Sequence, residues 1–339
     1  MAVFKDSLKI LPGLVLSLVL VAPAWGQLEK ASEGEPVCLT VFTRSVDIQG
    51  AMNISGWPQS APGAECTSEI VEEPFILKPP PREGPLVGPG SLPLVYYRKS
   101  GLVVFNGPVR VSSGIAIGHT LGEVSSTRGE ALFNGPVSIG SGLRAIGQGR
   151  AIFFNTVDIG KGGITLEGCR HGCSSLTFHG TVNIKGGRIY LSGDNSVVFK
   201  NEVRLESGGL IMDRTDSRAS VTLAGPTSAT ARELKVLGHN RLVLSLSPSM
   251  APEGFIQADS VELDADCLVI DSPIGLDLKE GAEIILITGW KIRLTGDNRK
   301  IITEQGDEFE LLVGEYRILA KLTKLARPYV WYDNLPFDY

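Results

Sequence analysis

Short runs of alternating apolar and polar residues recur between residues 94 and 214. Five runs share one order: a phenylalanine, a short polar or glycine-containing turn, a valine four positions after the phenylalanine, and an aliphatic residue two positions later. The phenylalanines are Phe105, Phe133, Phe153, Phe178 and Phe199. Each copy continues into a glycine-rich corner and another apolar run. Alternation over three to five residues, rich in Val and Ile, indicates short β-strands.

The spacing of these copies predicts a solenoid. The phenylalanines lie 20 to 28 residues apart, and a repeat of this size built from strands and turns is typical of solenoids. We expect Phe, Val and Ile to stack inward and Gly and Asn to occupy the corners. The sequence therefore predicts an all-β chain folded as a right-handed parallel β-helix with a C-terminal β cap. An antiparallel β-sandwich with glycine-rich hairpins is the alternative.

Beyond residue 214 the motif fades while the strands continue. Apolar runs predict strands at residues 220–223, 233–236, 241–246, 260–263, 267–270 and 283–288. The run from Gly281 to Thr288 is the most hydrophobic of the mature chain and predicts a fully buried strand. A solenoid needs its open end covered. We therefore assign residues 94–280 to β-helix rungs and residues 281–339 to the terminal rungs and the cap.

The N-terminus has the three parts of a secretory signal. Lys5 and Lys9 precede a short apolar run, Leu11–Val21, and Ala24 and Gly26 place small residues at a cleavage site. We expect residues 1–26 to be removed. The apolar run is shorter than the ~20 residues that a spanning helix needs, so no transmembrane span is expected in the mature chain. The predicted location is the outer surface or the exterior, with the periplasm as the alternative.

Proline dominates the segment that follows the signal. Residues 27–93 contain nine prolines between Pro58 and Pro93, and proline cannot donate a hydrogen bond to a β-ladder. This segment is predicted to be a poorly ordered spacer with one strand near residues 37–42. Asn53-Ile54-Ser55 matches a glycosylation sequon.

Composition narrows the class of protein. Glycine makes up 40 of 339 residues, above the usual ~7%, but no Gly-x-y period exists, so a collagen is excluded. The hydrophobic share of 43% argues against wholesale disorder. The net charge of −5 argues against a nucleic-acid partner, which would require a basic surface.

Five cysteines leave at least one thiol unpaired within the chain. Export permits disulfides, and two pairs are candidates: Cys169 with Cys173, closing a small loop, and Cys38 with Cys66, joining parts of the N-terminal segment. The alternative for Cys169, His171 and Cys173 is a zinc site. Zinc normally takes four ligands and no second pair matches, so neither a metal nor a cofactor is expected.

Catalytic candidates are few. Asp194, Asp213 and Asp216, with Arg214 and Arg218 nearby, are weak candidates for a polysaccharide-cleaving site, because such enzymes place carboxylates on one face. A solvated corner loop explains the same residues. Asp264 and Asp266, near Asp259, are expected on one side of a strand. His179 stands at a turn position and is predicted to be structural. The motifs of serine hydrolases, zinc proteases and phosphate loops are missing from the sequence.

The rung motifs resemble those of a known group of exported proteins. Phe105-Asn106, Phe133-Asn134, Gly163-Ile164 and Gly187-Arg188-Ile189 look like the rungs of autotransporter passenger domains and of chlamydial polymorphic membrane proteins. The run Gly281–Thr288 resembles the last β-helix strand before the cap of such passengers. The resemblance covers roughly residues 100–325. It also implies a C-terminal membrane barrel of about 12 strands, for which no room is expected after residue 325.

The resemblance and the lack of a catalytic constellation predict a non-enzymatic, exported binding protein of the adhesin or antigen type. Such a protein would present its β-helix side wall to a host or cell-surface protein or glycan. Two alternatives remain: an enzyme resembling polysaccharide lyases or glycoside hydrolases, in the periplasm or outside, and a self-assembling structural protein of the cell envelope.

Overall fold

A computed structural model of the chain describes residues 39–55, 68–78, 96–100, 102–118, 129–167, 173–224, 229–247, 254–272 and 278–326. All of them belong to one compact unit, Cys38–Tyr339. The described residues form strands β1 to β30 and a single short 3-10 helix, η1 (Ala265–Cys267). The chain is therefore all-β, as predicted. The predicted signal peptide, residues 1–26, lies outside the described residues.

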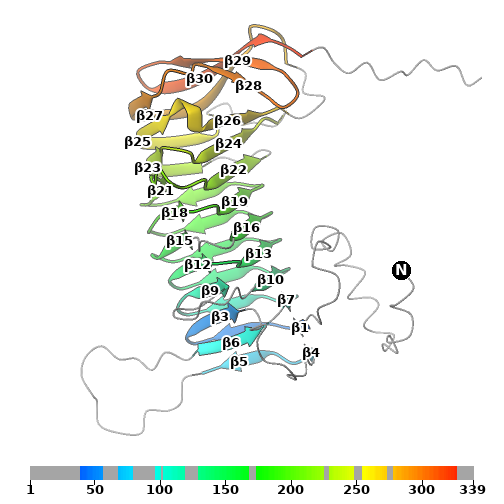
Figure 1. Cartoon of the computed structure of the whole chain (residues 1–339). Coiled ribbons are helices and arrows are strands. Elements are labelled where there is room, and N and C mark those ends of the chain that lie inside the picture. The colour runs from blue at the N-terminus through cyan, green and yellow to red at the C-terminus, as the bar shows by residue number, and fades with distance from the viewer. Residues whose placement is uncertain are drawn as a thin grey trace, which may run out of the picture. The chain divides into compact units, whose positions relative to one another are not determined.

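The strands stack as a parallel β-helix (Figure 1). Most rungs contain three strands, one on each of three faces. The first face is a 10-stranded parallel sheet. In stacking order, its strands are β4 (Glu69–Val71), β1 (Leu39–Phe42), β7 (Leu102–Phe105), β10 (Glu130–Phe133), β13 (Arg150–Phe153), β16 (Ser175–Phe178), β19 (Ser196–Phe199), β22 (Ser220–Ala224), β24 (Arg241–Ser245) and β26 (Leu268–Asp271).

The other two faces belong to a second, continuous sheet. The second face stacks β5 (Phe75–Leu77), β2 (Val46–Ile48), β8 (Val109–Val111), β11 (Val137–Ile139), β14 (Val157–Ile159), β17 (Val182–Ile184) and β20 (Val203–Leu205). The third face stacks β6 (Tyr96–Ser100), β3 (Ala51–Ser55), β9 (Ile115–Gly118), β12 (Gly142–Ile146), β15 (Gly163–Glu167), β18 (Ile189–Ser192) and β21 (Gly209–Met212). Both faces are continued by the longer strands β23 (Ala229–Val236), β25 (Ile256–Asp264) and β27 (Glu283–Thr295). The parallel pairing excludes the antiparallel sandwich.

A column of phenylalanines fills the core. Phe105, Phe133, Phe153, Phe178 and Phe199 occupy the same register position on successive rungs. Their ring centroids are 4.6 to 5.1 Å apart and the rings are nearly parallel. All five side chains are fully buried. The valines and aliphatic residues of the motif form buried columns beside them. The predicted inward stacking is confirmed.

Glycine allows successive corners to approach closely. A Cβ atom on Gly160 would lie 1.9 Å from the carbonyl oxygen of Gly140, and one on Gly208 would lie 1.5 Å from that of Gly187. No side chain fits at such distances. The glycine-rich corners of the sequence motif are therefore a steric requirement of rung stacking, in addition to the positive φ that Gly163 and Gly187 adopt.

The N-terminal segment differs from the predicted spacer. Strands β1 to β5, between Leu39 and Leu77, belong to the β-helix. Phe42 extends the phenylalanine column, with its ring centroid 5.1 Å from that of Phe105. The residues Phe42, Val46 and Ile48 repeat the spacing of the later motifs. Of the predicted spacer, residues 27–38, 56–67 and 79–93 lie outside the described part of the chain.

The first rungs also stack out of sequence order. The rung of β1, β2 and β3 lies between the rung of β4, β5 and β6 and the rung of β7, β8 and β9. In Figure 1 the blue strands accordingly lie between cyan strands and the green rungs. All pairs are parallel, so every rung winds in the same sense around the axis. The chain moves in one direction along the axis from the β1 rung to the β4 rung, and in the opposite direction from the β7 rung to the β10 rung. Because the sense of winding is the same, these two connections have opposite handedness.

The C-terminal cap is antiparallel. Strand β29 (Glu308–Val313) pairs antiparallel with both β28 (Lys300–Ile302) and β30 (Arg317–Lys324), and β30 pairs antiparallel with β27. The Glu308 carboxylate accepts hydrogen bonds from Lys300 and Lys324 and so links all three cap strands. Within the described ranges, no helix is long and apolar enough to cross a membrane.

Candidate functional site

The predicted carboxylates lie in stacked corner loops. Asp194 precedes β19, and Asp213 and Asp216 follow β21 one rung later; all three side chains are exposed. The two loops are linked through Gly193, whose carbonyl accepts hydrogen bonds from the Ser217 hydroxyl at 2.9 Å and from the Arg218 amide at 3.2 Å. None of the three carboxylates lines the hollow described below. The structure thus brings the two corner loops together on adjacent rungs.

Arg214 contacts an aromatic residue. Its Nε donates to the Tyr190 hydroxyl at 3.1 Å, and this hydrogen bond, with the nearby Asp216 and Asp213, raises the pKa of Arg214. The Arg188 guanidinium lies over the same tyrosine ring, 4.8 Å from its centroid. Two exposed cations therefore flank one aromatic ring on the third face, a cation–π arrangement that also offers donors to an anionic group.

The second acidic group is arranged differently from the prediction. Asp264 ends β25 and caps η1, where its side chain accepts a hydrogen bond from the Asp266 amide at 3.1 Å. Asp266 lies within η1, so the two residues do not share one side of a strand. The prediction was wrong because the chain turns a corner directly after Asp264, and the alternation of a strand ends there.

His179 packs against an outward-facing aromatic residue. Its ring stacks on Phe154 with centroids 4.9 Å apart. Burial, and then the charge of Lys200, lower the pKa of His179. This packing fits the predicted structural role. His119 and His171 lie outside the described residues.

The two described cysteines are both free thiols. Cys173 is exposed and Cys267 is buried. Burial, and then the charges of Asp264 and Asp266, raise the pKa of Cys267 to about 12. Because Cys173 is free, the predicted Cys169–Cys173 disulfide is not formed in the structure. Cys38 and Cys66 both lie outside the described residues, so their predicted disulfide stays a prediction.

The sequon at Asn53 lies inside β3. Its side chain is only 7% exposed, whereas a glycan needs an acceptor on the surface. In the folded chain this asparagine is therefore inaccessible for glycosylation.

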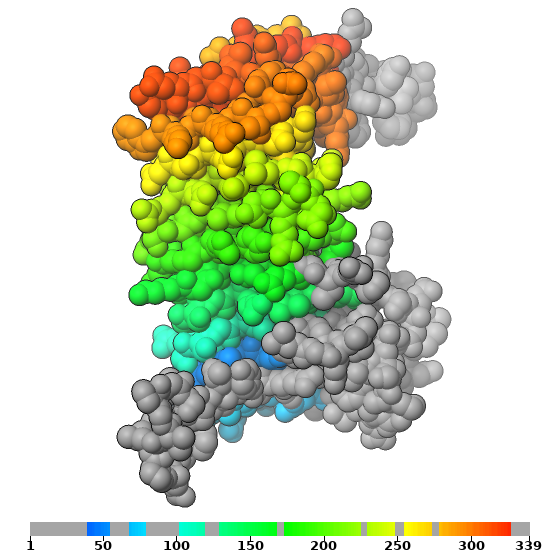
Figure 2. Space-filling view, turned by 60° about the vertical axis from the view of Figure 1, so that its left-hand side comes forward, coloured from blue at the N-terminus to red at the C-terminus, as the bar shows by residue number. Residues whose placement is uncertain are grey.

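Polar side chains form ladders along the outside of the rungs. Because strands are in register, residues at one position of the third face make a row that is polar except at Ala116 and the buried Ile211. The row consists of Ala116, Arg144, Thr165, Tyr190, Ile211, Lys235, Glu262 and Arg293. Glu262 pairs with Lys235 at 3.2 Å and Arg293 at 3.5 Å. On the second face, Asn183 donates to Asp158 at 2.9 Å. We call this outer surface of the second and third faces the side wall. Figure 2 shows successive rungs as stacked bands of colour.

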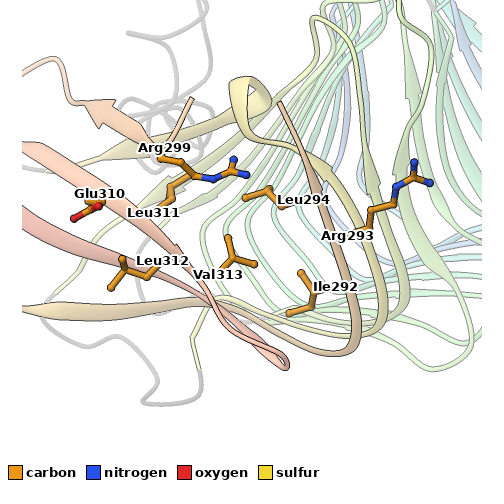
Figure 3. Close-up of a pocket in the computed structure, with 8 residues that line it drawn as sticks. All are labelled: Ile292, Arg293, Leu294, Arg299, Glu310, Leu311, Leu312 and Val313. Carbon is orange, nitrogen blue, oxygen red and sulfur yellow. The ribbon is translucent and has the colours of Figure 1, made fainter. Parts of the chain in front are cut away.

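A hollow opens in the cap, where sequence reasoning predicted no site (Figure 3). It has a volume of about 670 Å³ and is lined by Ile292–Leu294, Arg299 and Glu310–Val313. In Figure 3, Ile292 and Leu294 point toward Val313 across the hollow, whereas Arg293 points away from it. Its volume falls in the ~300–1,000 Å³ range of ligand sites, but this hollow is open to solvent.

Two exposed aromatic residues are close in sequence to residues that line this hollow. Trp290 is 79% exposed and Tyr316 is 51% exposed, with ring centroids 6.2 Å apart in an edge-to-face pair. A tryptophan this exposed is unusual, because such a ring normally buries most of its surface. Alternation along β27 places Trp290 with Ile292 and Leu294, so the sequence pattern contained no signal that the ring would face solvent.

In the part of the chain that the structure describes, no three His, Cys, Asp or Glu side chains gather to hold a metal ion.

Comparisons with protein-family models, with curated proteins and with solved structures find no match to this chain.

Proposed function

We propose that this chain is an exported, non-enzymatic binding protein of the adhesin or antigen type, acting at the cell surface or outside the cell. Its side wall would contact a host or cell-surface protein or glycan. The single observation that carries the proposal is the side wall itself: on the third face, polar residues occupy six of the eight positions of one row that runs in register along the rungs. A repeating polar surface suits an extended or repetitive ligand, which can contact several rungs at once.

The chemistry of the wall supports a binding role at one point in particular. Arg188 and Arg214 flank Tyr190 and are exposed. Guanidinium groups bind carboxylate or sulfate groups through paired hydrogen bonds, and an aromatic ring offers an apolar face for stacking. The enzyme alternative has no comparable support, since none of its candidate carboxylates lines the described hollow.

Protease treatment of intact source cells tests the location. An antibody against residues 102–326 would follow the solenoid before and after treatment. Loss of the signal from intact cells is expected. Protection until the envelope is opened would contradict the surface location, and would favour the periplasmic alternative.

Substitutions on the wall test the binding role. The double variant Arg188→Ser/Arg214→Ser is expected to lower binding to an array of sulfated and carboxylated glycans at least about tenfold, since two charge-assisted contacts are lost. Asp213→Asn/Asp216→Asn is the matched control in the same corner and is expected to retain binding. Loss of glycan turnover in that control, without loss of binding, would instead support the enzyme alternative.

A second candidate function is self-assembly, and one observation favours it. The end rung of β4, β5 and β6 has a neighbouring rung on one side only among the described strands, and the end strand of a sheet can recruit a further strand. Sedimentation at rising protein concentration distinguishes the candidates. A constant monomer would exclude assembly, whereas growing oligomers would support it.

A further inference from the structure

The end rung of β4, β5 and β6 leaves its end of the core partly uncovered. Figure 1 shows this rung at one end of the stack and the cap at the other. In the neighbouring rung, the inward residues Val46 and Ile48 are at most 1% exposed. Their register partners Phe75 and Leu77 pack against the same core but are only partly buried. Between them, the outward Ile76 is 58% exposed. The end rung is therefore an apolar surface that the described residues do not cover.

The two ends of the solenoid cannot stack on one another. At the cap, Phe309 and Ile318 are fully buried, and the antiparallel strands β28 to β30 do not continue the parallel rungs. Head-to-tail stacking of two copies therefore lacks a matching surface. Two end rungs can meet head to head, related by a two-fold axis, in which case each copy presents the same surface. Such an axis lies across the solenoid and reverses the strand direction, so the end strands of two copies meet antiparallel.

The backbone of β5 is oriented for this pairing. The Phe75 N–H donates to the Ser45 carbonyl at 2.9 Å. The Leu77 carbonyl accepts from the Gln49 N–H at 2.9 Å. Because backbone groups alternate between the two edges of a strand, the N–H and C=O of Ile76 point away from β2, the only described strand that pairs with β5. A two-fold axis through Ile76 lets this residue exchange both of its backbone hydrogen bonds with the partner's Ile76.

The charges beside Ile76 are complementary under the same symmetry. Glu72 and Glu73 precede β5, Lys78 follows it, and all three are exposed; no ion pair among the described residues engages them. Antiparallel pairing centred on Ile76 places Pro74 opposite the partner's Lys78, whose amide can donate to the Pro74 carbonyl. The Lys78 side chain then lies beside the partner's Glu72 and Glu73. Symmetry repeats this contact on the other side of the axis, so opposite charges meet at both places.

From these observations we propose that the end rung is a dimerisation surface whose partner is a second copy of this chain, bound head to head. Strand β5 pairs antiparallel with its copy through Ile76, and the open ends of the two cores cover each other. Because the dimer uses both end rungs, assembly stops at two copies. The proposal rests on the self-assembly candidate, for which it specifies the surface and the size, and it is independent of binding at the side wall.

Sedimentation velocity of the full chain at rising concentration tests the proposal. A monomer–dimer equilibrium without larger species is expected. Ile76→Asp places two carboxylates against each other at the axis and is expected to raise the dimer dissociation constant at least about tenfold, a difference of 1.4 kcal/mol. Ile302→Asp, at a cap residue that is 61% exposed, is the matched control and is expected to have no effect. A constant monomer would overturn the dimer, whereas growth beyond two copies would overturn the closed interface and still support self-assembly.

Exchange of the charges identifies the contact. Lys78→Glu and the double variant Glu72→Lys/Glu73→Lys are each expected to dimerise at least about tenfold more weakly, because like charges then meet on both sides of the axis. A mixture of the two variants is expected to form a heterodimer of about wild-type affinity, since every contact regains opposite charges. Fluorescence anisotropy of one labelled variant, titrated with the other, measures this affinity. These exposed positions keep the test valid if Ile76→Asp perturbs folding, which a thermal melt would reveal. Failure of the mixture to form a heterodimer would overturn the proposed interface.

Hydrogen exchange reports the strand pairing itself. The Ile76 amide is expected to exchange rapidly in dilute, monomeric protein and at least about tenfold more slowly at concentrations where the dimer forms. The Phe75 amide, which is bonded to Ser45 within one chain, is the internal control and is expected to change less. Unchanged exchange of the Ile76 amide in the dimer would overturn the pairing of β5 with its copy.

Discussion

At the scale of single residues, two adjacent phenylalanines have opposite environments. Phe153 is fully buried in the centre of the ring column, whereas Phe154 is 37% exposed and stacks on His179. Phe153→Ala is expected to lower the free energy of unfolding by about 3–5 kcal/mol, because it leaves a cavity between two stacked rings. Urea denaturation measures the change. Phe154→Ala is the control and is expected to cost less than about 1 kcal/mol; similar losses in both variants would contradict the column as the main source of stability.

Cys267 gives a prediction on reactivity. Only a thiolate reacts rapidly with alkylating reagents, and the pKa of about 12 keeps this buried thiol protonated at neutral pH. Under reducing conditions, iodoacetamide is expected to label the exposed Cys173 rapidly and Cys267 only after denaturation. Mass spectrometry of the two peptides measures both rates in one sample. Equal labelling of the native chain would show that Cys267 is accessible.

Residue patterns predicted the core better than the surface. Phe105 and its four equivalents could be placed inside because the motif repeats around them. Phe42 was missed because its copy of the motif lies within the proline-rich segment, where composition outweighed spacing. Trp290 could not be placed at all, since its exposure depends on where β30 stops pairing with β27. That end point is set by tertiary contacts, which a local pattern does not contain.

At the scale of elements, the glycine corners decide how closely rungs stack. Gly160→Ala is expected to destabilise the chain by about 1–3 kcal/mol or more, since the new Cβ would clash with the Gly140 carbonyl and force two corners apart. Gly314→Ala is the matched control, because its Cβ would meet only the Cγ and the carbonyl oxygen of Arg317, both at the ordinary contact distance of 3.6 Å. Thermal unfolding compares them. Equal stability of both variants would show that the corners can separate at little cost.

The strands were predictable as elements, and their boundaries at corners were not. Alternation placed the strands around each phenylalanine, because burial on one face imposes that pattern. The continuous apolar run placed the strand after Gly281, but its predicted full burial was wrong, since within Glu283–Thr288 only Leu286 and Ile287 are buried. The Asp264–Asp266 corner was misread as strand, since a 3-10 turn of three residues leaves almost no mark in polarity. The cap hollow was also missed, because it forms where two strands diverge.

At the scale of the whole molecule, the stacking order of rungs differs from their order along the chain. The motif spacing specifies which residues face inward but contains no information on which rung neighbours which. The position of β1 between β4 and β7 depends on pairings between residues 29 and 63 positions apart, such as Phe42 with Val71 and Phe42 with Phe105. Sequence patterning could therefore predict the solenoid without predicting its first two rungs.

Hydrogen exchange distinguishes the stacking order of the rungs in the structure from their order along the chain. In a solenoid, each rung is stabilised only by its neighbours, so the end rungs open first. Strands β1 and β2 have neighbours on both sides, whereas β4 and β5 have a neighbour on one side only within the described residues. Amides of residues 39–48 are therefore expected to exchange at least about tenfold more slowly than those of residues 69–77, although they lie nearer the N-terminus. Residues 150–159, in the middle of the stack, serve as the protected reference. Faster exchange in residues 39–48 than in residues 69–77 would mean that the β1 rung, not the β4 rung, is the exposed end of the solenoid.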